Sequence, residues 1–499
     1  MRQLFGQKAH VSLVLLILAA GTLAHRIDAQ PASAKRGSHA GAANETIPAL
    51  MVSDIHFDPF HDPGKIQQLV DAPASHWNAL LAAPPSPNQK QAFDALQQQC
   101  KLRGVDTSYD LLQSSLQAMR ARQPDAKFMT VSGDLMAHAF SCRFKALLPQ
   151  STQSDYQLFT LKTLSFVVSS LHLTFPHIPI YVALGNNDSG CGDYQLDAGS
   201  DFLTQAGKIL ADALPPPQQQ DAIRQFAEGG YYSIAMAAPM KDTRILVVND
   251  VFLSPKYKTC GGLPDVTAAD TEMKWLKEQL ASAQQAGQKA WMLGHIPPGI
   301  DAYSTVAKLK NVCAQAKPVM FLSSSKMDDL MTEYAGAIRL GIFAHTHMDE
   351  LRLLQPKGGD PSPNADQSVV LKLASSISPI DGNNPSFTAS RINPSTATLE
   401  DYQVFVASNQ TGVDATWPGE YDYAHTYHEP QFSPATIKDL IGKFQADREA
   451  KQQISENYIH NYFPGDRSRE LTPFWPQYAC SLANSTAESY AACVCSAKQ

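Results

Sequence analysis

Five short apolar segments along the chain each run directly into a turn that carries Asp, Asn or His. Each segment is rich in branched or aromatic residues and is bounded by turn residues, which is typical of a buried strand. Helical patterns separate them, at 107–122, 156–171 and 271–285. This alternation predicts an α/β sandwich. The five segments are 48–53, 127–132, 178–184, 289–293 and 337–343, and further strands are expected at 231–236, 244–249, 369–374 and 402–407.

The polar residues that follow these segments share one position, just beyond the carboxyl end of a strand. In open α/β sheets this edge is where ligands bind, so five distant loops can converge on one place. Alternate residues leaving a strand can point to the same side, which allows Asp54 and His56 to reach one ion. The predicted metal ligands are Asp54, His56, Asp134, Asn186, His295, His345 and His347.

Each motif alone has an ordinary structural explanation. An Asp after a strand is a common helix N-cap, and Gly-Asn-Asn-Asp is a common turn. A single His after a strand is often structural, whereas the pair His345 and His347 is a stronger indication of a metal. Together the motifs supply carboxylate, imidazole and amide ligands, a mixture that suits Zn, Fe or Mn. The combination therefore predicts a metal site.

In their order, these motifs resemble those of the calcineurin-like metallophosphoesterase superfamily, whose pattern is DxH, GDxx, GNH(D/E), GH and GHxH. The resemblance covers about residues 47–408. Within the superfamily the chain is most similar to the acid sphingomyelinase-like phosphodiesterases. The features that carry this closer likeness are His138, four residues after Asp134, the segment 378–393 and the Cys-containing tail.

The resemblance implies a four-layer β-sandwich flanked by helices, with two divalent metals at its centre. One metal would be held by Asp54, His56, Asp134 and His347, and the other by Asp134, Asn186, His295 and His345. Asp134 would bridge them, because one carboxylate can span two cations about 3.5–4 Å apart. Zn is the first choice of metal, with Fe or Mn as alternatives. A hydroxide shared by the metals would then attack phosphorus.

Asn187 departs from the family pattern, because His usually follows the metal-binding Asn. An amide can donate a hydrogen bond to phosphate but cannot supply a proton to the leaving group. His138 is the candidate general acid, since imidazole titrates in the useful range. Gly-Asn-Asn-Asp also resembles the endopolyphosphatases, which cleave polyphosphate. Ala344, where Gly is usual, is a small departure.

The chain divides into five predicted parts. Residues 1–29 have the basic start and the short apolar run of a signal peptide, with an uncleaved membrane anchor as the alternative. Residues 30–46 are expected to be a flexible linker and 47–410 the catalytic domain. A Pro-rich insertion at 57–104 should border the active site. Residues 411–499 are expected to form a small helical subdomain stapled by disulfides.

The eight cysteines of an exported chain predict disulfides, with free buried thiols as the alternative. Cys493 and Cys495 are too close in sequence to pair easily with each other. They should reach separate partners, one of which can be Cys480. A bond between Cys142 and Cys191 is expected to join two loops of the site.

The formal net charge of −7 gives no general attraction for nucleic acid. No segment after the N-terminal region is long and apolar enough to span a membrane. We therefore expect a secreted or periplasmic monomer that hydrolyses phosphodiesters, with phosphomonoesters as a further option. Its substrate could be a lipid head group, a nucleotide or polyphosphate. The alternatives are an endopolyphosphatase-like enzyme and an exported metal-binding protein without activity.

Overall fold

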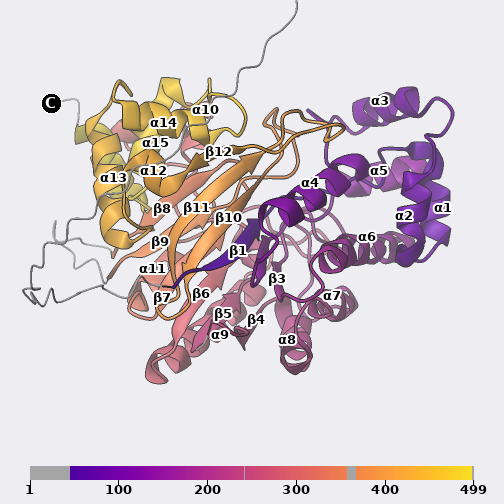
Figure 1. The fold of residues 1–499 in the computed structure, drawn as a ribbon, viewed down its shortest axis with the longest axis horizontal. Coiled ribbons are helices and arrows are strands. Elements are labelled where there is room, and N and C mark those ends of the chain that lie inside the picture. The colour runs from indigo at the N-terminus through magenta and orange to yellow at the C-terminus, as the bar shows by residue number, and fades with distance from the viewer. Residues whose placement is uncertain (1–44, 241, 357–366, 497–499) are drawn as a thin grey trace, which may run out of the picture. The chain divides into compact units, whose positions relative to one another are not determined.

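Two six-stranded mixed sheets form the centre of the computed structural model (Figure 1). In the first sheet β1, β2 and β3 are parallel, and in the second β5, β6, β7 and β9 are parallel. The order in the first sheet is β12 (Gly419–Asp422), β11 (Thr398–Val406), β10 (Ser386–Asn393), β1 (Ile47–Val52), β2 (Met129–Ser132) and β3 (Ile180–Ala183). The order in the second is β4 (Tyr232–Ala235), β5 (Thr243–Val247), β6 (Lys289–Leu293), β7 (Ile338–Phe343), β9 (Val369–Leu373) and β8 (Glu350–Leu354).

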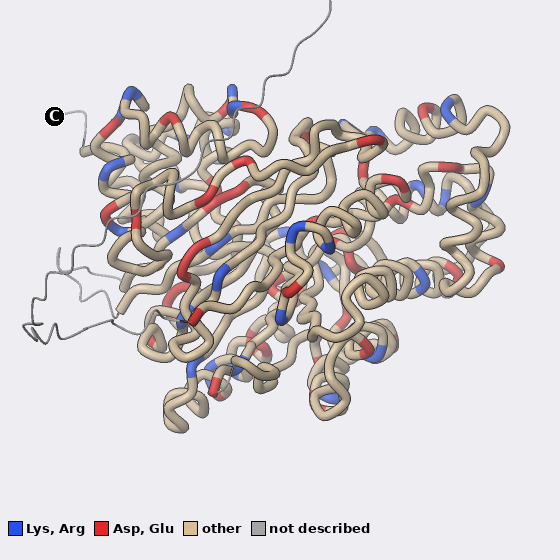
Figure 2. Tube along the Cα trace, in the orientation of Figure 1, with Lys and Arg blue, Asp and Glu red and all other residues tan. Residues whose placement is uncertain are grey.

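The structure describes residues 45–240, 242–356 and 367–496. The predicted signal peptide and most of the predicted linker lie outside these residues. Within them, no helix is long and apolar enough to cross a membrane. Figure 2 shows Lys and Arg interspersed with Asp and Glu along the chain, without a continuous basic stripe.

All nine predicted strands are confirmed, and three strands were missed. The missed strands are β8, β10 and β12, which add to the sheets in antiparallel pairings. The pattern of β8 is misleading because two of its residues are charged yet buried. Glu350 and Arg352 pair with each other at 3.0 Å, so that the whole strand is buried. The predicted α/β sandwich is confirmed.

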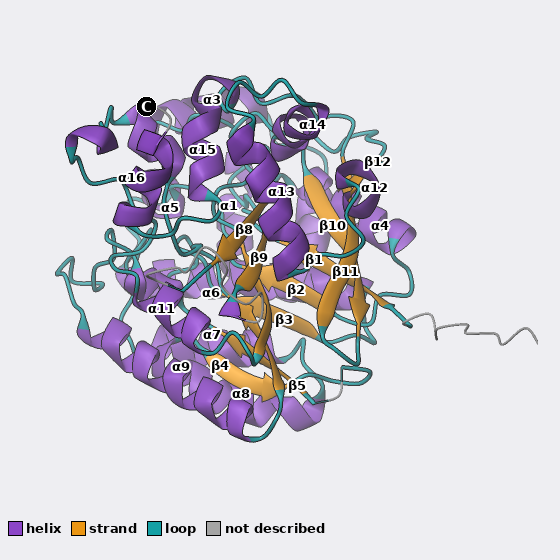
Figure 3. Ribbon diagram, turned by 90° about the vertical axis from the view of Figure 1, so that its left-hand side faces the viewer, coloured by secondary structure: helices purple, strands orange, loops and turns teal. Residues whose placement is uncertain are grey.

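Helices lie on both sides of the strands (Figure 3). The three predicted helices are α4 (Tyr109–Arg122), α6 (Gln153–Thr174) and α9 (Thr267–Gln285). Ser108 caps α4 by accepting a hydrogen bond from the Leu111 amide, and Thr152 and Asp155 form a capping box on α6. The sheets pack together through contacts such as Phe128 against Trp291, with ring centroids 5.6 Å apart. The remaining helices of this part are α5 (Phe140–Leu147), α7 (Asp201–Ala211), α8 (Pro216–Gly229), α10 (Ala302–Ala307) and α11 (Lys326–Glu333).

The segment predicted as an insertion, 57–104, folds into three short helices. They are α1 (Ile66–Asp71), α2 (Trp77–Ala82) and α3 (Gln89–Gln99). Trp77 is fully buried and packs on Phe159 and Phe166 of α6. This segment is therefore anchored on α6 by an aromatic contact, and its role as an insertion that borders the active site stays a prediction.

The C-terminal region is helical, as predicted. Its helices pack on β8, β9 and β11 within the same compact unit as the sheets, and a boundary at residue 411 stays a prediction. Two of its helices are separated at Asp447, whose carboxylate accepts from the Lys451 and Gln452 amides. The helices are α12 (Tyr423–Tyr427), α13 (Pro434–Ala446), α14 (Gln453–Tyr462), α15 (Trp475–Ser481) and α16 (Ala487–Cys495).

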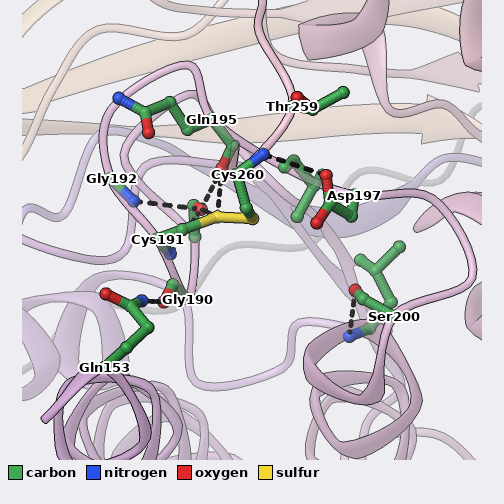
Figure 4. Close-up of a disulfide and its surroundings, with 12 residues drawn as sticks. Gln153, Gly190, Cys191, Gly192, Gln195, Asp197, Ser200, Thr259 and Cys260 are labelled. Carbon is green, nitrogen blue, oxygen red and sulfur yellow. Dashed lines mark hydrogen bonds between the residues drawn. A yellow bond between two sulfur atoms is a disulfide. The ribbon is translucent and has the colours of Figure 1, made fainter. Parts of the chain in front are cut away.

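Four disulfides join the eight cysteines. Cys493 and Cys495 reach separate partners, as predicted, since they pair with Cys480 and Cys313. The predicted bond between Cys142 and Cys191 is wrong. Cys142 lies on α5, beside the end of α3, and pairs there with Cys100, while Cys191 pairs with Cys260 (Figure 4). Four disulfides fit a protein of an oxidising compartment outside the cytoplasm.

A buried ion pair links the C-terminal helices to the second sheet. Glu350 accepts from Arg352 at 3.0 Å and from the Tyr478 hydroxyl of α15 at 2.9 Å. Replacing Glu350 with Ala would leave a buried guanidinium without its counter-charge. We expect Glu350→Ala to lower the free energy of unfolding by about 3–5 kcal/mol, measured by denaturant unfolding.

The matched control is Glu333→Ala. Glu333 pairs with Lys277 at 3.1 Å, but both side chains are exposed. An exposed pair adds little to stability, so this variant should unfold like the unmodified protein. Equal unfolding of the two variants would show that the buried pair does not fasten the helices.

Candidate metal centre

The loops after β1, β2, β3, β6 and β7 meet at one place and bring all seven predicted ligands together. Backbone hydrogen bonds connect the loops: the Asp54 amide donates to Gly133 at 3.1 Å, and the Ala344 amide donates to His295 at 2.9 Å. The convergence predicted from the sequence is therefore what the structure shows. What these side chains bind remains a proposal.

Asp54, His56 and Asp134 form the first half of the centre, with one ligand atom of each within 4.8 Å of the others. The Nε2 atom of His56 lies 3.4 Å from Asp134 Oδ2 and 3.7 Å from Asp54 Oδ1. His347 Nε2 lies 3.4 Å from the same Asp54 oxygen. All of these side chains are buried.

Asp134, His295 and His345 form the second half. His295 Nε2 lies 3.3 Å from Asp134 Oδ2 and 3.1 Å from both His345 Nδ1 and Asn186 Oδ1. Asp134 belongs to both halves, which is the position expected of a bridging carboxylate.

A second set of contacts orients the imidazoles. His56 Nδ1 donates to the Met136 carbonyl at 2.8 Å, and His295 Nδ1 donates to the Ser132 carbonyl at 2.7 Å. The Nδ1 atom of His347 lies 3.2 Å from Asp381 Oδ2. These contacts leave the Nε2 atoms free to face the centre, as in the outer contacts of metal-binding histidines.

The backbone at the centre is strained in a repeated way. Left-handed φ angles occur at Asp54 (46°), His56 (45°), Asp134 (52°), His345 (74°) and His347 (66°). Such residues cost of order 1–3 kcal/mol each and cluster at functional sites. Five of the seven predicted ligands therefore have a strained backbone.

Gly185 allows the closest approach of two loops in the centre. A Cβ atom at this position would lie 2.1 Å from Asp134 Oδ1. The carboxylate of Asp134 can therefore sit between the loops only because position 185 carries no side chain.

The donor set fits divalent cations. Asp54 Oδ1 is buried and accepts no hydrogen bond, although two imidazole nitrogens face it. Burial opposes ionisation of Asp54, but the charge of His347 lowers its pKa to about 2, so the carboxylate is ionised. Burial lowers the pKa of His295, but Asp134 raises it to about 10. The carboxylates of Asp54 and Asp134 thus favour positive charge in the centre. Two divalent metals would supply that charge.

His138 lies beside the first half of the centre and is partly exposed. Its ring stacks on His56 with centroids 3.9 Å apart. Its Nδ1 atom lies 2.9 Å from Asp106 Oδ1, and Arg143 donates to the other Asp106 oxygen at 3.1 Å. Burial raises the pKa of Asp106, but the charge and hydrogen bond of His138 and the charge of Arg143 together outweigh burial and lower it. Asp106 is therefore an anion that orients His138.

Asn187 contacts the centre through Asp134. Its side-chain amide donates to Asp134 Oδ2 and its backbone amide to Oδ1, both at 2.8 Å. Asp188 accepts from the amides of Leu135, Met136 and Gly185, and so joins the loops after β2 and β3.

Four residues at the site were missed from the sequence: Asp106, Tyr194, Asp250 and Asp381. Each contacts a predicted residue, as Asp250 does by accepting from the His295 amide at 2.6 Å. Asp250 directly follows the predicted strand 244–249, and Asp381 lies in the segment 378–393 that carries the closer likeness, so these two had a signal in the sequence. Asp106 and Tyr194 follow no predicted strand, and only the fold brings them to the centre.

Metal content tests the assignment of Asp134. The unmodified protein should retain two divalent metals per chain after dialysis, and Asp134→Ala should lose both because both halves share this carboxylate. His347→Ala should lose the metal of the first half only. Elemental analysis, with circular dichroism to confirm folding, makes the measurement. A folded Asp134→Ala protein that keeps both metals would contradict the assignment.

No protein-family model matches the chain. Its relatives include sphingomyelinase phosphodiesterase D of Dictyostelium discoideum, 25% identical over 78% of this chain and 80% of the relative. The cyclic GMP-AMP phosphodiesterase SMPDL3A of Mus musculus is 24% identical over 83% of each chain. Acid sphingomyelinase-like phosphodiesterase 3b of Mus musculus is 22% identical over 89% of each.

Among solved structures, a dimetal phosphatase from Danio rerio aligns with 75% of this chain and 99% of its own, at 10% identity and a TM-score of 0.41. The calcineurin-like phosphoesterase YfkN from Bacillus subtilis aligns with 80% of this chain and 96% of its own, at 9% identity and a TM-score of 0.29. These scores are low, so the sequence relatives and the site are the guides to function.

Proposed function

We propose that this chain is a secreted phosphodiesterase with a two-metal centre. Its homologues are acid sphingomyelinase-like phosphodiesterases, and the chain is a metal-dependent phosphoric ester hydrolase. The observation that supports this most is the position of Asp134 between the buried imidazoles of His56 and His295. Secretion is supported by four disulfides.

Two divalent cations, when bound, would act as Lewis acids on the phosphoryl oxygens and make water acidic enough to attack near neutral pH. The protein would hold them with Asp54, His56, Asp134, Asn186, His295, His345 and His347, with Zn as the first choice and Fe or Mn as alternatives. Asn187 would hold Asp134 in place with its two hydrogen bonds.

His138 is the general acid of the proposal. It is exposed enough to meet a leaving group, and Asp106 holds its Nδ1 atom, so Nε2 is the nitrogen that can carry a proton to the leaving oxygen. Asn187 occupies the usual place of a family histidine and cannot do this.

The relatives and one motif of the chain indicate different phosphate esters as the substrate. Relatives are named for sphingomyelin and for cyclic GMP-AMP, while the sequence Gly185-Asn186-Asn187-Asp188 resembles endopolyphosphatases. Phosphodiester hydrolysis is the leading proposal and polyphosphate hydrolysis the alternative. An inactive metal-binding protein is disfavoured, because the complete ligand set comes together in one buried centre.

Hydrolysis of bis(p-nitrophenyl) phosphate tests the two-metal proposal. The purified protein should release p-nitrophenolate, a chelator should abolish the release, and added Zn, Fe or Mn should restore it. Asp134→Ala should lower kcat by several orders of magnitude, because Asp134 would hold both of the metals that activate water. Turnover that survives complete removal of metal would refute the mechanism.

Leaving-group dependence tests His138. His138→Ala should lower kcat about 10²- to 10⁴-fold on a dinucleotide, whose leaving group is an alcohol, and much less on the activated aryl diester. Asp106→Asn should likewise lower kcat more on the dinucleotide than on the aryl diester. The double variant should lower kcat little further than His138→Ala does, because both changes disrupt the same His138–Asp106 pair.

The control for Asp106→Asn is Asp110→Asn. Asp110 is exposed and lies near the start of α4, so this variant should behave like the unmodified enzyme. Equal losses on the two substrates would remove His138 from the role of acid.

A further inference from the structure

Lys256 lies at the rim of the second half of the metal centre. Its ammonium donates to the Tyr194 hydroxyl at 3.2 Å and lies 4.6 Å from the centroid of the Tyr194 ring. The same hydroxyl is 3.3 Å from Nε2 of His345, whose Nδ1 atom faces the centre. Lys256 is thus connected to a predicted metal ligand through a single side chain.

Several bonds hold the segment of Tyr194 against the segment of Lys256. The Cys191–Cys260 disulfide joins them covalently (Figure 4). The Lys258 amide donates to the Tyr194 carbonyl at 3.0 Å, and the Tyr257 hydroxyl donates to the Leu196 carbonyl at 2.9 Å. The positions of Tyr194 and Lys256 are therefore fixed relative to the loop that contains Asn186.

The charge of Lys256 is not neutralised by the protein. Among the described residues no carboxylate lies within 4.0 Å of its ammonium, whereas Arg143 near the same centre pairs with Asp58 and Asp106. The ammonium has three N–H groups, and within the described part of the chain its one hydrogen-bond acceptor is the Tyr194 hydroxyl. The residue is exposed, so the remaining donors can reach a bound molecule.

We propose that Lys256, positioned by Tyr194, is a specificity-determining residue that binds a second phosphate next to the scissile one. The inference rests on the proposed function, because the scissile phosphate is the one that the metal centre would hold. An unpaired ammonium beside the centre favours a substrate with adjacent phosphates, as in a nucleoside polyphosphate or an inorganic polyphosphate. The same charge repels a cationic group such as choline at this position.

Four substrates test the inference: ATP, inorganic tripolyphosphate, bis(p-nitrophenyl) phosphate and p-nitrophenylphosphorylcholine. Lys256→Met should lower kcat/KM about tenfold on ATP and tripolyphosphate, the loss expected for one charged hydrogen bond. It should leave the aryl diester unchanged and should not impair the choline ester. Comparing ATP with tripolyphosphate then shows which source of adjacent phosphates is preferred.

Two variants serve as controls. Lys258→Met removes an exposed ammonium two residues away and should leave all four rates unchanged. Lys256→Arg retains the charge and should recover most of the rate on ATP. Equal losses on all four substrates, or no loss on any, would refute the role of Lys256.

Binding measured by calorimetry provides a readout that does not require turnover. The metal-loaded protein should bind adenosine 5′-(α,β-methylene)diphosphate more tightly than AMP, and Lys256→Met should remove this preference. An unchanged preference would overturn the inference even if the enzyme is active. Failure of the unmodified protein to hydrolyse any of the four substrates would instead count against the proposed function, and the titration would still decide the role of Lys256.

Discussion

The rest of the centre depends on the carboxylate of Asp134. One of its oxygens lies 3.4 Å from His56 Nε2 and 3.3 Å from His295 Nε2, so a single side chain faces both halves. Asn187 holds both oxygens, and Gly185 leaves the space that they occupy. Two metals held by this carboxylate would lie close together, as joint action on one phosphate requires.

Strain at the ligands is balanced by the bonds between their loops. Five ligands have left-handed backbones, which would relax if the loops were free. Asp188 ties the loops after β2 and β3 together through three backbone amides, and Asp250 holds the amide of His295. Burial raises the pKa of Asp188 and of Asp250 to about 7, because removal from water disfavours the charged carboxylate. The fold therefore buries both groups at a cost in free energy. These bonds thus hold the loops of the predicted ligands in place.

Chemistry and selectivity come from different parts of the molecule. The seven predicted metal ligands and His138 leave the ends of central strands or lie close behind them, where the buried sheets fix their positions. Tyr194 and Lys256 lie on longer loops joined by a disulfide, outside the sheets. A loop can vary without disturbing the core, so the choice of phosphate ester can change while the seven predicted ligands stay in place. The binding of a second phosphate, which we assign to Lys256, belongs to these loops.

The sequence by itself determined the two sheets' central strands, the seven residues at their ends and the helical C-terminal region. These follow from local patterns, because a strand's length, its apolar content and the turn after it are written in consecutive residues. Only the tertiary structure decided that Asp106 orients His138, that Lys256 reaches His345 through Tyr194, and that Cys142 pairs with Cys100 rather than Cys191. Such contacts join segments far apart in the chain, and no local pattern records which distant surfaces meet when the core closes.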